Sequence, residues 1–497
     1  MILLFNPQSS ANRKPILPMS LLAVGAVLEG RHDYAIVDGN LAADALAELD
    51  GRIRAAGGAA VLGVTVMPGP QLAQAVPLCR ELKQRYPRLT VVWGGYFPTQ
   101  HWDVCLRADY VDYVVRGHGE FAFAALLAAL AGGRAAPDDD TLAGIPGLAY
   151  RGADGAPRSN PLAPIPAPKG LPPWNFDRVP VERYVRRTFL GTRTLGYHSS
   201  YGCPFFCNFC AVVNMVNGRW LPQTAVQVAH AAEVYQQRWG VNAIEFYDNN
   251  FFTQEARVAE FSQRVMGRGL AWWGEGRVDT MLAYAPRTWA LMRDAGLKMV
   301  FLGAESGSAE TLRRMDKGGQ MSPEKTLALV AQMAAHGIVP ELSFVLGNPP
   351  DPEADARGTM DFIRRVKRVN PRTEIILYLY TPVPLAGDLY DEAQAGGFAF
   401  PQTLEAWVSG EWLDFSQRRS VGLPWMKRPL HQQLRDFERV LNAYYPTSTD
   451  VRLRGWRRWL LRGAAAWRYH ARLYRGPLEL RVLQRLLAYQ RPETSGF

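Results

Sequence analysis

Three cysteines in one short stretch are the residues of this chain best suited to do chemistry. Cys203, Cys207 and Cys210 follow the spacing C-x3-C-x2-C, and the aromatic residue Phe209 directly precedes the third of them. Cysteine thiolates are the usual ligands of iron–sulfur clusters, so three of them on a tight loop can hold three irons of a [4Fe–4S] cube. The fourth iron then has no ligand from this loop and can bind a small molecule. The spacing indicates a catalytic cluster rather than one that only transfers electrons.

A zinc site is the main alternative for this motif. Structural zinc needs four Cys or His ligands, and the chain has no second cysteine pair. Cys79 and Cys105 lie far from the motif and are expected to be buried thiols. Five cysteines in 497 residues argue against a disulfide scaffold and for a reducing cytoplasm.

Composition and charge place few further limits on the protein. With 48% hydrophobic and 21% charged residues it is an ordinary globular chain, long enough for two or three domains. The apolar start is interrupted by Asn6 and Pro7, so we expect a buried first strand rather than a signal peptide. No stretch reaches the ~18 uninterrupted apolar residues that a membrane-spanning helix needs. Between Val451 and Phe497 eleven arginines stand against two glutamates, so the net charge of +10 belongs mostly to this tail.

Residues 1–145 alternate short apolar strands with helical stretches, which predicts a Rossmann-like parallel α/β sheet. The expected strands are Ile2–Phe5, Tyr34–Val37, Ala60–Val66, Thr90–Trp93 and Tyr110–Val115. The expected helices are Ser20–Glu29, Leu41–Ala56, Pro70–Tyr86 and Glu120–Ala131. Ligands of such sheets bind beyond the carboxyl ends of the strands, and here those ends carry glycines and polar residues. We therefore expect a ligand across this edge, with plain turn chemistry as the alternative for any single loop.

Residues 146–190 and 191–400 are expected to be a linker and a second α/β domain. Eight prolines between Pro157 and Pro180 predict an extended linker, because proline at that density supports neither a helix nor a ladder. Six β/α units follow, typical of a partial (β/α)6 barrel whose chemistry lies at the carboxyl ends of its strands. The expected strands are Thr194–Ser200, Ala243–Tyr247, Ala271–Gly276, Met299–Gly303, Glu341–Leu346 and Glu374–Tyr380. The cysteine loop directly follows the first of them.

The cysteine motif at the end of the first barrel strand resembles that of radical S-adenosylmethionine (SAM) enzymes, and the likeness covers residues 190–400. The resemblance implies that SAM binds the open iron and is cleaved reductively to a 5′-deoxyadenosyl radical. It makes the three cysteines of the motif the catalytic and metal-ligating residues. The residues that it places around SAM are Phe209, Asp248, Arg277, Glu305, Ser306 and Ser343.

The same resemblance assigns roles to several of these residues. Arg277 would pair with the methionyl carboxylate of SAM. Glu305 or Ser306 would contact its amino group or ribose, and Phe209 would lie near its adenine. A buried carboxylate such as that of Glu305 needs partners, which the ligand could supply.

The N-terminal 145 residues carry a second resemblance, to the cobalamin-binding domain that precedes many radical SAM barrels. It rests on Gly94-Gly95-x2-Pro98-Thr99, on the string from Val115 to Glu120, and on the string from Leu17 to Leu22. The residues that it places at cobalamin are Ser20, Thr65, Met67, Gly94, Gly95, Tyr96, Pro98, Thr99, Gly117, His118, Gly119 and Glu120.

Two departures from that family's pattern bear on the cobalt. The string D-x-H-x2-G is absent, so the resemblance implies cobalamin without a protein histidine on the metal. His118 stands where family members usually have glutamate, and Phe97 where many have histidine. We expect His118 to be a hydrogen-bonding loop residue rather than a cobalt ligand.

Residues 401–497 change character and form a basic, mainly helical segment. Trp456, Trp459 and Trp467 recur at near-helical spacing with arginines between them. The simplest interpretation is a helical cap on the barrel. A helix lying on an anionic membrane is one alternative, and a nucleic-acid contact is another.

Together the two resemblances imply a cobalamin-dependent radical SAM methyltransferase that methylates an unactivated carbon through methylcobalamin. One alternative keeps both cofactors but performs cyclisation, oxidation or rearrangement, as in the anaerobic magnesium-protoporphyrin ester cyclase group. Another, of a different class, is an iron–sulfur protein that binds nucleic acid or a membrane through the tail. Expected partners are a low-potential electron donor of the flavodoxin or ferredoxin type and a small substrate. Trp407, Trp412 and Trp425 are compatible with a hydrophobic one.

Overall fold

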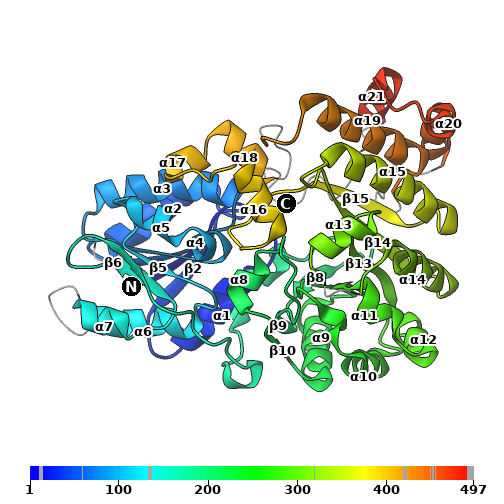
Figure 1. The fold of residues 1–497 in the computed structure, drawn as a ribbon. Coiled ribbons are helices and arrows are strands. Elements are labelled where there is room, and N and C mark those ends of the chain that lie inside the picture. Colours follow the sequence, from blue (N-terminus) through cyan, green and yellow to red (C-terminus); the bar gives the residue numbers. More distant parts are fainter. Residues whose placement is uncertain are drawn as a thin grey trace.

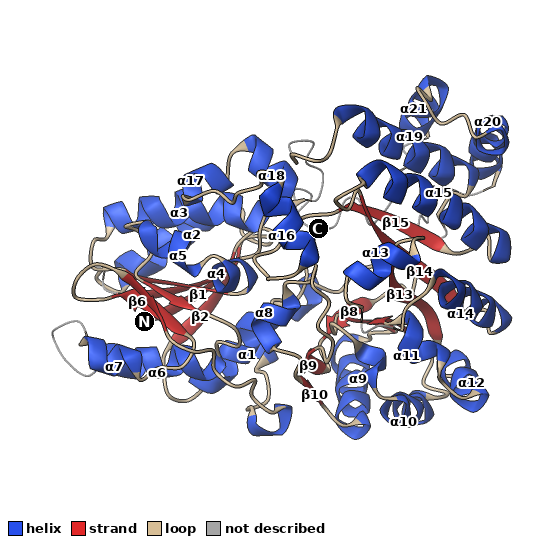
Figure 2. Cartoon of the chain, viewed as in Figure 1, coloured by secondary structure: helices blue, strands red, loops and turns tan. Residues whose placement is uncertain are grey.

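Two parallel β-sheets, each flanked by helices, organise the chain, and a group of helices follows them (Figures 1 and 2). The computed structural model describes residues 1–9, 15–58, 60–131, 137–317, 320–417, 423–447, 449, 453, 455–487 and 489. In Figure 1 the first sheet lies in the left half of the molecule and the second in the right half. The expected class is confirmed: a Rossmann-like region, a partial barrel and a helical C-terminal part.

The first sheet contains the five predicted parallel strands. They are β1 Ile2–Asn6, β2 Tyr34–Asp38, β3 Val61–Thr65, β4 Thr90–Gly94 and β5 Tyr113–Val115, in the order β2-β1-β3-β4-β5. The predicted helices are present as α1 Met19–Leu28, α2 Ala45–Ala55, α3 Pro70–Arg85 and α6 Glu120–Ala131. Helices that the sequence did not predict are α4 Tyr96–Gln100, α5 Trp102–Arg107 and α7 Asp139–Ala143. Because the strands run parallel, their carboxyl ends meet at one edge.

The first sheet continues into the stretch expected to be an extended linker. β6 Leu148–Arg151 and β7 Pro157–Ser159 add two antiparallel strands beyond β5. The expectation that proline density excludes ladder pairing was therefore wrong at Pro157. β7 lies at the edge of the sheet, so one of its sides pairs with no other strand. A proline, which has no N–H to donate, is tolerated in such an edge strand. Short 3₁₀ turns at Pro168–Gly170, Phe176–Arg178 and Val181–Arg183 lead on to the barrel.

The second sheet is the predicted six-stranded parallel array. Its strands are β8 Thr194–Tyr197, β11 Ala243–Phe246, β12 Ala271–Gly276, β13 Leu297–Glu305, β14 Val339–Leu346 and β15 Glu374–Leu379, in the order β15-β14-β13-β12-β11-β8. Helices between them are α9 Ala225–Trp239, α10 Glu255–Val265, α11 Val278–Leu282, α12 Pro286–Asp294, α13 Ala309–Arg314, α14 Pro323–Ala335 and α15 Pro352–Val369, with a 3₁₀ turn at Phe251–Thr253. A small hairpin of β9 Ser200–Gly202 and β10 Trp220–Pro222 encloses α8 Val212–Val216.

The two faces of the second sheet differ in burial. Trp272 of β12 and Val300 and Leu302 of β13 are fully buried, as expected for residues packed under the covering helices. Their neighbours Trp273 and Phe301 point to the opposite face and are only half-buried. The alternation therefore separates a helix-covered core from an inner face with room beside it.

The C-terminal helices form two groups. α16 Asp388–Ala395, α17 Leu404–Trp407 and α18 Gly410–Ser416 come first, then α19 Arg428–Tyr444, α20 Trp456–Ala471 and α21 Leu478–Leu486. α17 lies against the first region, where Tyr110 donates a hydrogen bond to Glu405 at 2.9 Å. α20 lies against the barrel, where Arg364 of α15 donates to the carbonyl of Tyr469 at 2.6 Å. The predicted cap is thus confirmed for this second group.

Parts of the C-terminal predictions need qualification. The tail arginines 452, 454 and 491 and the glutamate 493 lie outside the described residues. Trp407, expected to suit a hydrophobic substrate, is only 2% exposed and packs edge-on against Phe97 at 5.1 Å between ring centroids. Within the described residues, no helix combines the length and apolarity needed to cross a bilayer.

Candidate active site

The cysteine loop runs from the end of β9 to the start of α8, beside the carboxyl end of the barrel. Cys207 is 8% exposed, while Cys203 and Cys210 are half-buried. The N–H of Cys210 donates to the carbonyl of Cys207 at 3.1 Å, which tightens the loop. Gly202 precedes it with φ +82, and a Cβ there would collide with the carbonyl oxygen of Arg219. The loop therefore requires glycine at this position.

Two cations approach the thiols of this loop. Arg277 donates from Nη1 to Sγ of Cys207 at 3.5 Å. Burial raises the pKa of the Cys207 thiol, while the positive charges of Lys317 and Arg277 act in the opposite direction. Among the described residues, no three Cys, His, Asp or Glu side chains are already gathered as a metal site, so holding a cluster requires the thiols to turn toward one another. A donor set of thiolates flanked by cations fits an anionic cluster.

Arg277 is tightly held at the end of β12. It is 6% exposed and forms an ion pair with Asp279, with Nη2 and Oδ2 2.8 Å apart. Its guanidinium also lies 3.7 Å from the ring centroid of Phe205, on the cysteine loop. The residue predicted to bind the SAM carboxylate thus lies beside the loop predicted to hold the cluster.

Glu305 lies at the end of β13 in a left-handed conformation, with φ +62. Such a backbone is costly for a residue with a side chain and is often found at functional sites. Its Oε1 pairs with Nζ of Lys317 at 2.7 Å, and Ser343 donates to Oε2 at 3.5 Å. Lys317 is only 4% exposed and was not predicted, because hydrophobic periodicity gives no reason to place a lysine inside a protein.

Other predicted SAM residues have structural partners. Asp248 is fully buried and accepts hydrogen bonds from the N–H and hydroxyl of Ser199, at 3.0 and 2.8 Å. Ser306 donates to Asp355 of α15 at 3.0 Å. Phe209 is half-buried against the hydrophobic core. Asp248 and Ser306 therefore tie strand ends to their neighbours, whatever else they contact.

The edge of the first sheet is joined by backbone and hydroxyl hydrogen bonds. Thr99 donates from Oγ1 to the carbonyl of Gly95 at 2.7 Å and accepts from the N–H of Gly117 at 2.9 Å. Gly95 has φ +99, and a Cβ there would lie 3.0 Å from Oγ1 of Thr65. The ends of β3, β4 and β5 thus meet in a shallow backbone cradle that has no space for a side chain at Gly95.

The remaining predicted cobalamin residues line the same edge with different exposure. Met67 is 48% exposed and Glu120 only 4% exposed. Oε2 of Glu120 has no hydrogen-bond partner within the described parts of the chain, and its Oε1 lies 3.8 Å from Nδ1 of His118. Ser20, at the start of α1, is exposed. The others are buried or half-buried: Gly94, Tyr96, Pro98 and Gly119. An orphaned buried carboxylate oxygen beside a glycine cradle fits a polar ligand at this edge.

The edges of the two sheets face each other. The ring of His118 lies 5.0 Å from that of Tyr201, which opens the cysteine motif. Gln100 at the end of α4 donates to the carbonyl of Ala211 at 3.1 Å and accepts from Asn214 of α8 at 2.7 Å. The predicted cobalamin edge and the predicted cluster loop are therefore in direct contact.

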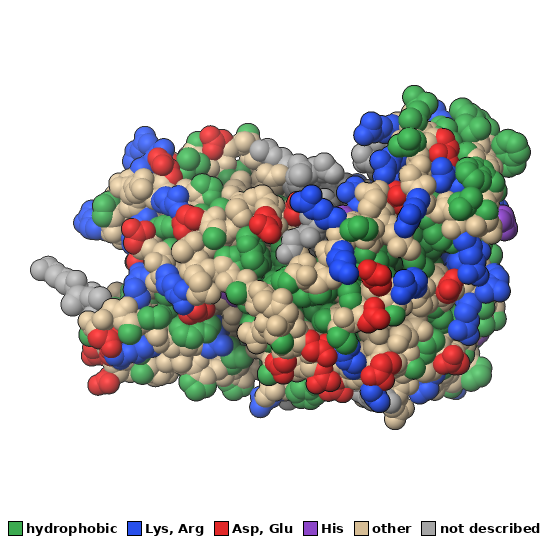
Figure 3. Space-filling view, turned by 45° about the horizontal axis from the view of Figure 1, so that its top comes forward, with side chains coloured by type: hydrophobic (Ala, Val, Ile, Leu, Met, Phe, Trp, Pro, Cys, Tyr) green, Lys and Arg blue, Asp and Glu red, His purple; other side chains and the backbone are tan. Residues whose placement is uncertain are grey.

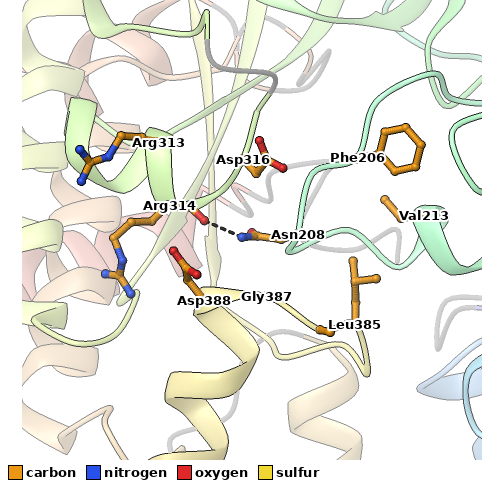
Figure 4. A pocket seen from close by; sticks show the side chains of 10 residues that line it. Phe206, Asn208, Val213, Arg313, Arg314, Asp316, Leu385, Gly387 and Asp388 are labelled. Atoms are coloured by element: carbon orange, nitrogen blue, oxygen red, sulfur yellow. Dashed lines mark hydrogen bonds between the residues drawn. The ribbon is translucent and has the colours of Figure 1, made fainter.

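A cavity of about 470 Å³ borders the outer side of the cysteine loop. Figure 4 shows Phe206 and Val213 on one side and Arg313 and Arg314 on the other. Asn208 closes part of the space between them by donating to the carbonyl of Arg314 at 2.6 Å. Phe206 is 53% exposed, so this face of the loop is accessible from solvent.

Two family matches cover these two regions. Residues 13–127 match the B12 binding domain, and residues 197–363 match the radical SAM superfamily. The first match contains the glycine cradle. The second contains the cysteine loop and the ends of β11 to β14.

Two curated proteins are similar to this chain over about two thirds of its length or more. An uncharacterized methyltransferase of Pyrococcus horikoshii is 26% identical over 73% of this chain and 78% of that protein. An anaerobic magnesium-protoporphyrin IX monomethyl ester cyclase of Synechocystis sp. is 26% identical over 65% of this chain and 64% of that protein.

Among solved structures, the cobalamin-dependent S-adenosylmethionine radical enzyme OxsB, with aqua-cobalamin and SAM bound, has the same fold. Its TM-score is 0.62 at 18% identity, over 76% of this chain and 53% of OxsB, so the match spans about half of OxsB. The cysteine loop, the glycine cradle and the two family matches lead to one conclusion. The chain carries an N-terminal B12-binding domain and a radical SAM domain, and is a radical SAM enzyme whose cofactors are a [4Fe–4S] cluster, SAM and cobalamin.

Proposed function

We propose that the protein is a cobalamin-dependent methyltransferase that transfers a methyl group to an unactivated carbon of a small molecule. The contact between the two edges carries this proposal. His118 of the cobalamin edge contacts Tyr201 of the cluster loop, and Gln100 bridges to Ala211. A radical source and a methyl donor must both reach one substrate carbon, so they have to be held close together.

The residues of the cluster loop have distinct roles in this proposal. Cys203, Cys207 and Cys210 hold the cluster, and Arg277 and Lys317 offset its negative charge. When bound, the cofactors supply reductive cleavage of SAM and a methyl group carried on cobalamin. Homolytic C–H cleavage needs little help from general acids or bases. The side chains of the site therefore bind and orient SAM and the substrate, and they exclude water.

The SAM side of the site is polar and preorganised. Glu305, fixed by Lys317 and approached by Ser343, is the group proposed for the amino or ribose end of SAM. Arg277 is proposed for the carboxylate and Phe209 for the adenine. The side chains of Asp248 and Ser306 hold neighbouring segments in place. The backbone at these two residues is proposed to contact SAM.

A cyclase or oxidase is the second candidate, supported by the similarity to the Synechocystis cyclase. The two functions differ in their products. Methylation yields S-adenosylhomocysteine together with 5′-deoxyadenosine, whereas radical chemistry without transfer yields 5′-deoxyadenosine alone. Assaying both products with the anaerobically reconstituted holoenzyme decides between them. Turnover without S-adenosylhomocysteine removes methyl transfer from the proposal.

The proposed reaction needs a reductant for the cluster and a small-molecule substrate. We infer that a flavodoxin or ferredoxin docks over the cavity beside Phe206, where Arg313, which is exposed and pairs with Glu310, can exchange that partner for a carboxylate of an acidic donor. Arg313→Glu should slow reduction by flavodoxin several-fold and leave reduction by dithionite unchanged. Equal loss with both reductants argues for damage to the loop instead.

The inner face of the barrel is proposed to receive the substrate. Trp273 and Phe301 are half-buried there, and so is Glu275, whose pKa is raised by burial. Aromatic rings around a carboxyl group suit a mainly hydrophobic substrate that carries a hydrogen-bond donor.

A further inference from the structure

Helices α20 and α21 expose an unusual number of large apolar side chains. Trp459 is 76% exposed, Trp456 67% and Leu486 77%. Trp467, Leu478 and Val482 are each more than half exposed on the same two helices. We call these six residues the tail surface. In Figure 3 the region over these helices, at the upper right, is largely green and interspersed with blue.

The tail surface is distinct from the face that holds α20 to the protein. Leu461 and Ala465 of α20 are fully buried. At about 100° per residue, Trp459 and Trp467 point to the opposite side of the helix from these two. α20 therefore has two apolar faces, and packing within the chain accounts for only one. Contiguous apolar surface of this kind on a single chain usually marks an interaction site.

The charge around the tail surface is mostly positive, although Arg472 forms an ion pair with Asp361 of α15, with Nη1 and Oδ1 3.2 Å apart. Six arginines of this region are exposed: Arg457, Arg458, Arg462, Arg472, Arg475 and Arg485. Between residues 455 and 487 the only acidic residue is Glu479, and it is paired with Arg468 at 3.0 Å. The partner that complements this region is therefore apolar in its interior and anionic at its surface.

We propose that the tail surface docks the enzyme on an anionic lipid bilayer, with α20 and α21 lying in the plane of the interface. Tryptophan prefers the boundary between headgroups and acyl chains, and arginines beside it attract anionic headgroups. A nucleic acid would satisfy the arginines but would leave leucine and valine side chains in water. A bilayer accommodates both, and it brings the barrel to a source of hydrophobic substrates.

The test uses the full-length holoenzyme and vesicles of phosphatidylcholine with or without phosphatidylglycerol. We expect sedimentation with the anionic vesicles only, weakening as salt rises, together with a blue shift of tryptophan emission. The triple variant Trp459→Ser, Trp467→Ser, Leu486→Ser should lose about tenfold or more in vesicle binding, because buried apolar area sets the affinity. Phe121→Ser with Val226→Ser is the matched control, because both residues are about half exposed but lie on α6 and α9.

A second set of variants tests the charges. Arg457→Gln with Arg462→Gln should remove the preference for anionic vesicles while leaving the helices and their apolar residues intact. The proposal is overturned if wild type ignores anionic vesicles at low salt, or if the triple variant binds as well as the control. It is also overturned if the tail surface instead binds duplex DNA or RNA more tightly than vesicles, or if it joins two copies into a dimer that the triple variant dissolves. Turnover with a soluble substrate should be unchanged in all of these variants, which separates this proposal from the assignment of the reaction.

Discussion

The edge of the first sheet and the edge of the barrel are built from different kinds of residue. At the first, Gly95, Thr99 and Gly117 are joined through backbone atoms and one hydroxyl. At the second, Glu305 and Lys317 form a buried ion pair beside Arg277. The first edge suits a large flat ligand recognised by shape, and the second suits a charged amino acid beside a charged cluster. We therefore propose cobalamin for the first edge and SAM with the cluster for the second.

Removing a thiol should damage the barrel edge most. Cys207→Ala should abolish iron–sulfur absorbance and all SAM cleavage, because a cube held at two corners has lost a protein ligand. Cobalamin should still bind, because the first edge does not contain this residue, but less completely than to protein with an assembled cluster. Absorbance spectra and 5′-deoxyadenosine assays measure both effects. Cys105→Ala, a buried thiol of the first region, is the control, and SAM cleavage by Cys207→Ala at the control's rate would refute the cluster assignment.

Breaking the buried ion pair should destabilise the fold. Lys317→Met leaves the carboxylate of Glu305 buried without its cation, which should lower the free energy of unfolding by about 3 kcal/mol. Chemical denaturation of the protein measures the change. Arg293→Ala removes an exposed ion pair with Asp294 and should cost less than about 1 kcal/mol. Equal costs for the two variants would mean that Lys317 does not hold Glu305.

A single methyl group should disturb the first edge. Gly95→Ala places a Cβ 3.0 Å from Oγ1 of Thr65 in a backbone conformation that favours glycine, and should weaken cobalamin binding about tenfold. Gly30→Ala meets the same backbone preference, with φ +72, but its Cβ would have nothing within 4 Å. Hydroxocobalamin titrations compare the two variants. Identical affinities of the two variants would contradict a role of the cradle around Gly95 in cobalamin binding.

The last prediction concerns the pH dependence of stability. Burial, and then the negative charge of Asp248, raise the pKa of Glu275 from 4.5 to about 8. Between about pH 5 and 8 Glu275 is protonated in the folded state and ionised in the unfolded state. The free energy of unfolding therefore falls as pH rises through this range. Glu275→Gln should flatten that fall and stabilise the protein at pH 9 by up to about 5 kcal/mol, since one pKa unit is worth about 1.4 kcal/mol. Thermal unfolding across pH checks this, and an unchanged slope in the variant contradicts it.

Much of the scaffold was readable from hydrophobic patterning. β12 begins and ends at the predicted residues, Ala271 and Gly276, because an apolar strand is a local signal. β7 was missed because the tolerance of an edge strand for proline depends on its place in the sheet. Lys317 was missed because its partner, Glu305, lies on a different element.

The candidate sites show the same division. The cysteine spacing and the glycine strings are local, so the residues of both edges could be named from the sequence. The partners of these residues could not be predicted from the sequence. That Asp248 is satisfied by Ser199, or that Glu120 keeps an unpartnered oxygen beside His118, follows only from how distant segments pack.

The side-chain amide of Gln100, at the end of α4, accepts from Asn214 of α8 and donates to the carbonyl of Ala211, which directly follows Cys210, so one side chain links the two edges. We therefore expect the binding of the two cofactors to be coupled. Cobalamin bound against α4 should also restrain the cysteine loop, and an assembled cluster should in turn favour cobalamin binding. Reconstitution with both components together should therefore give more complete occupancy than supplying either one alone.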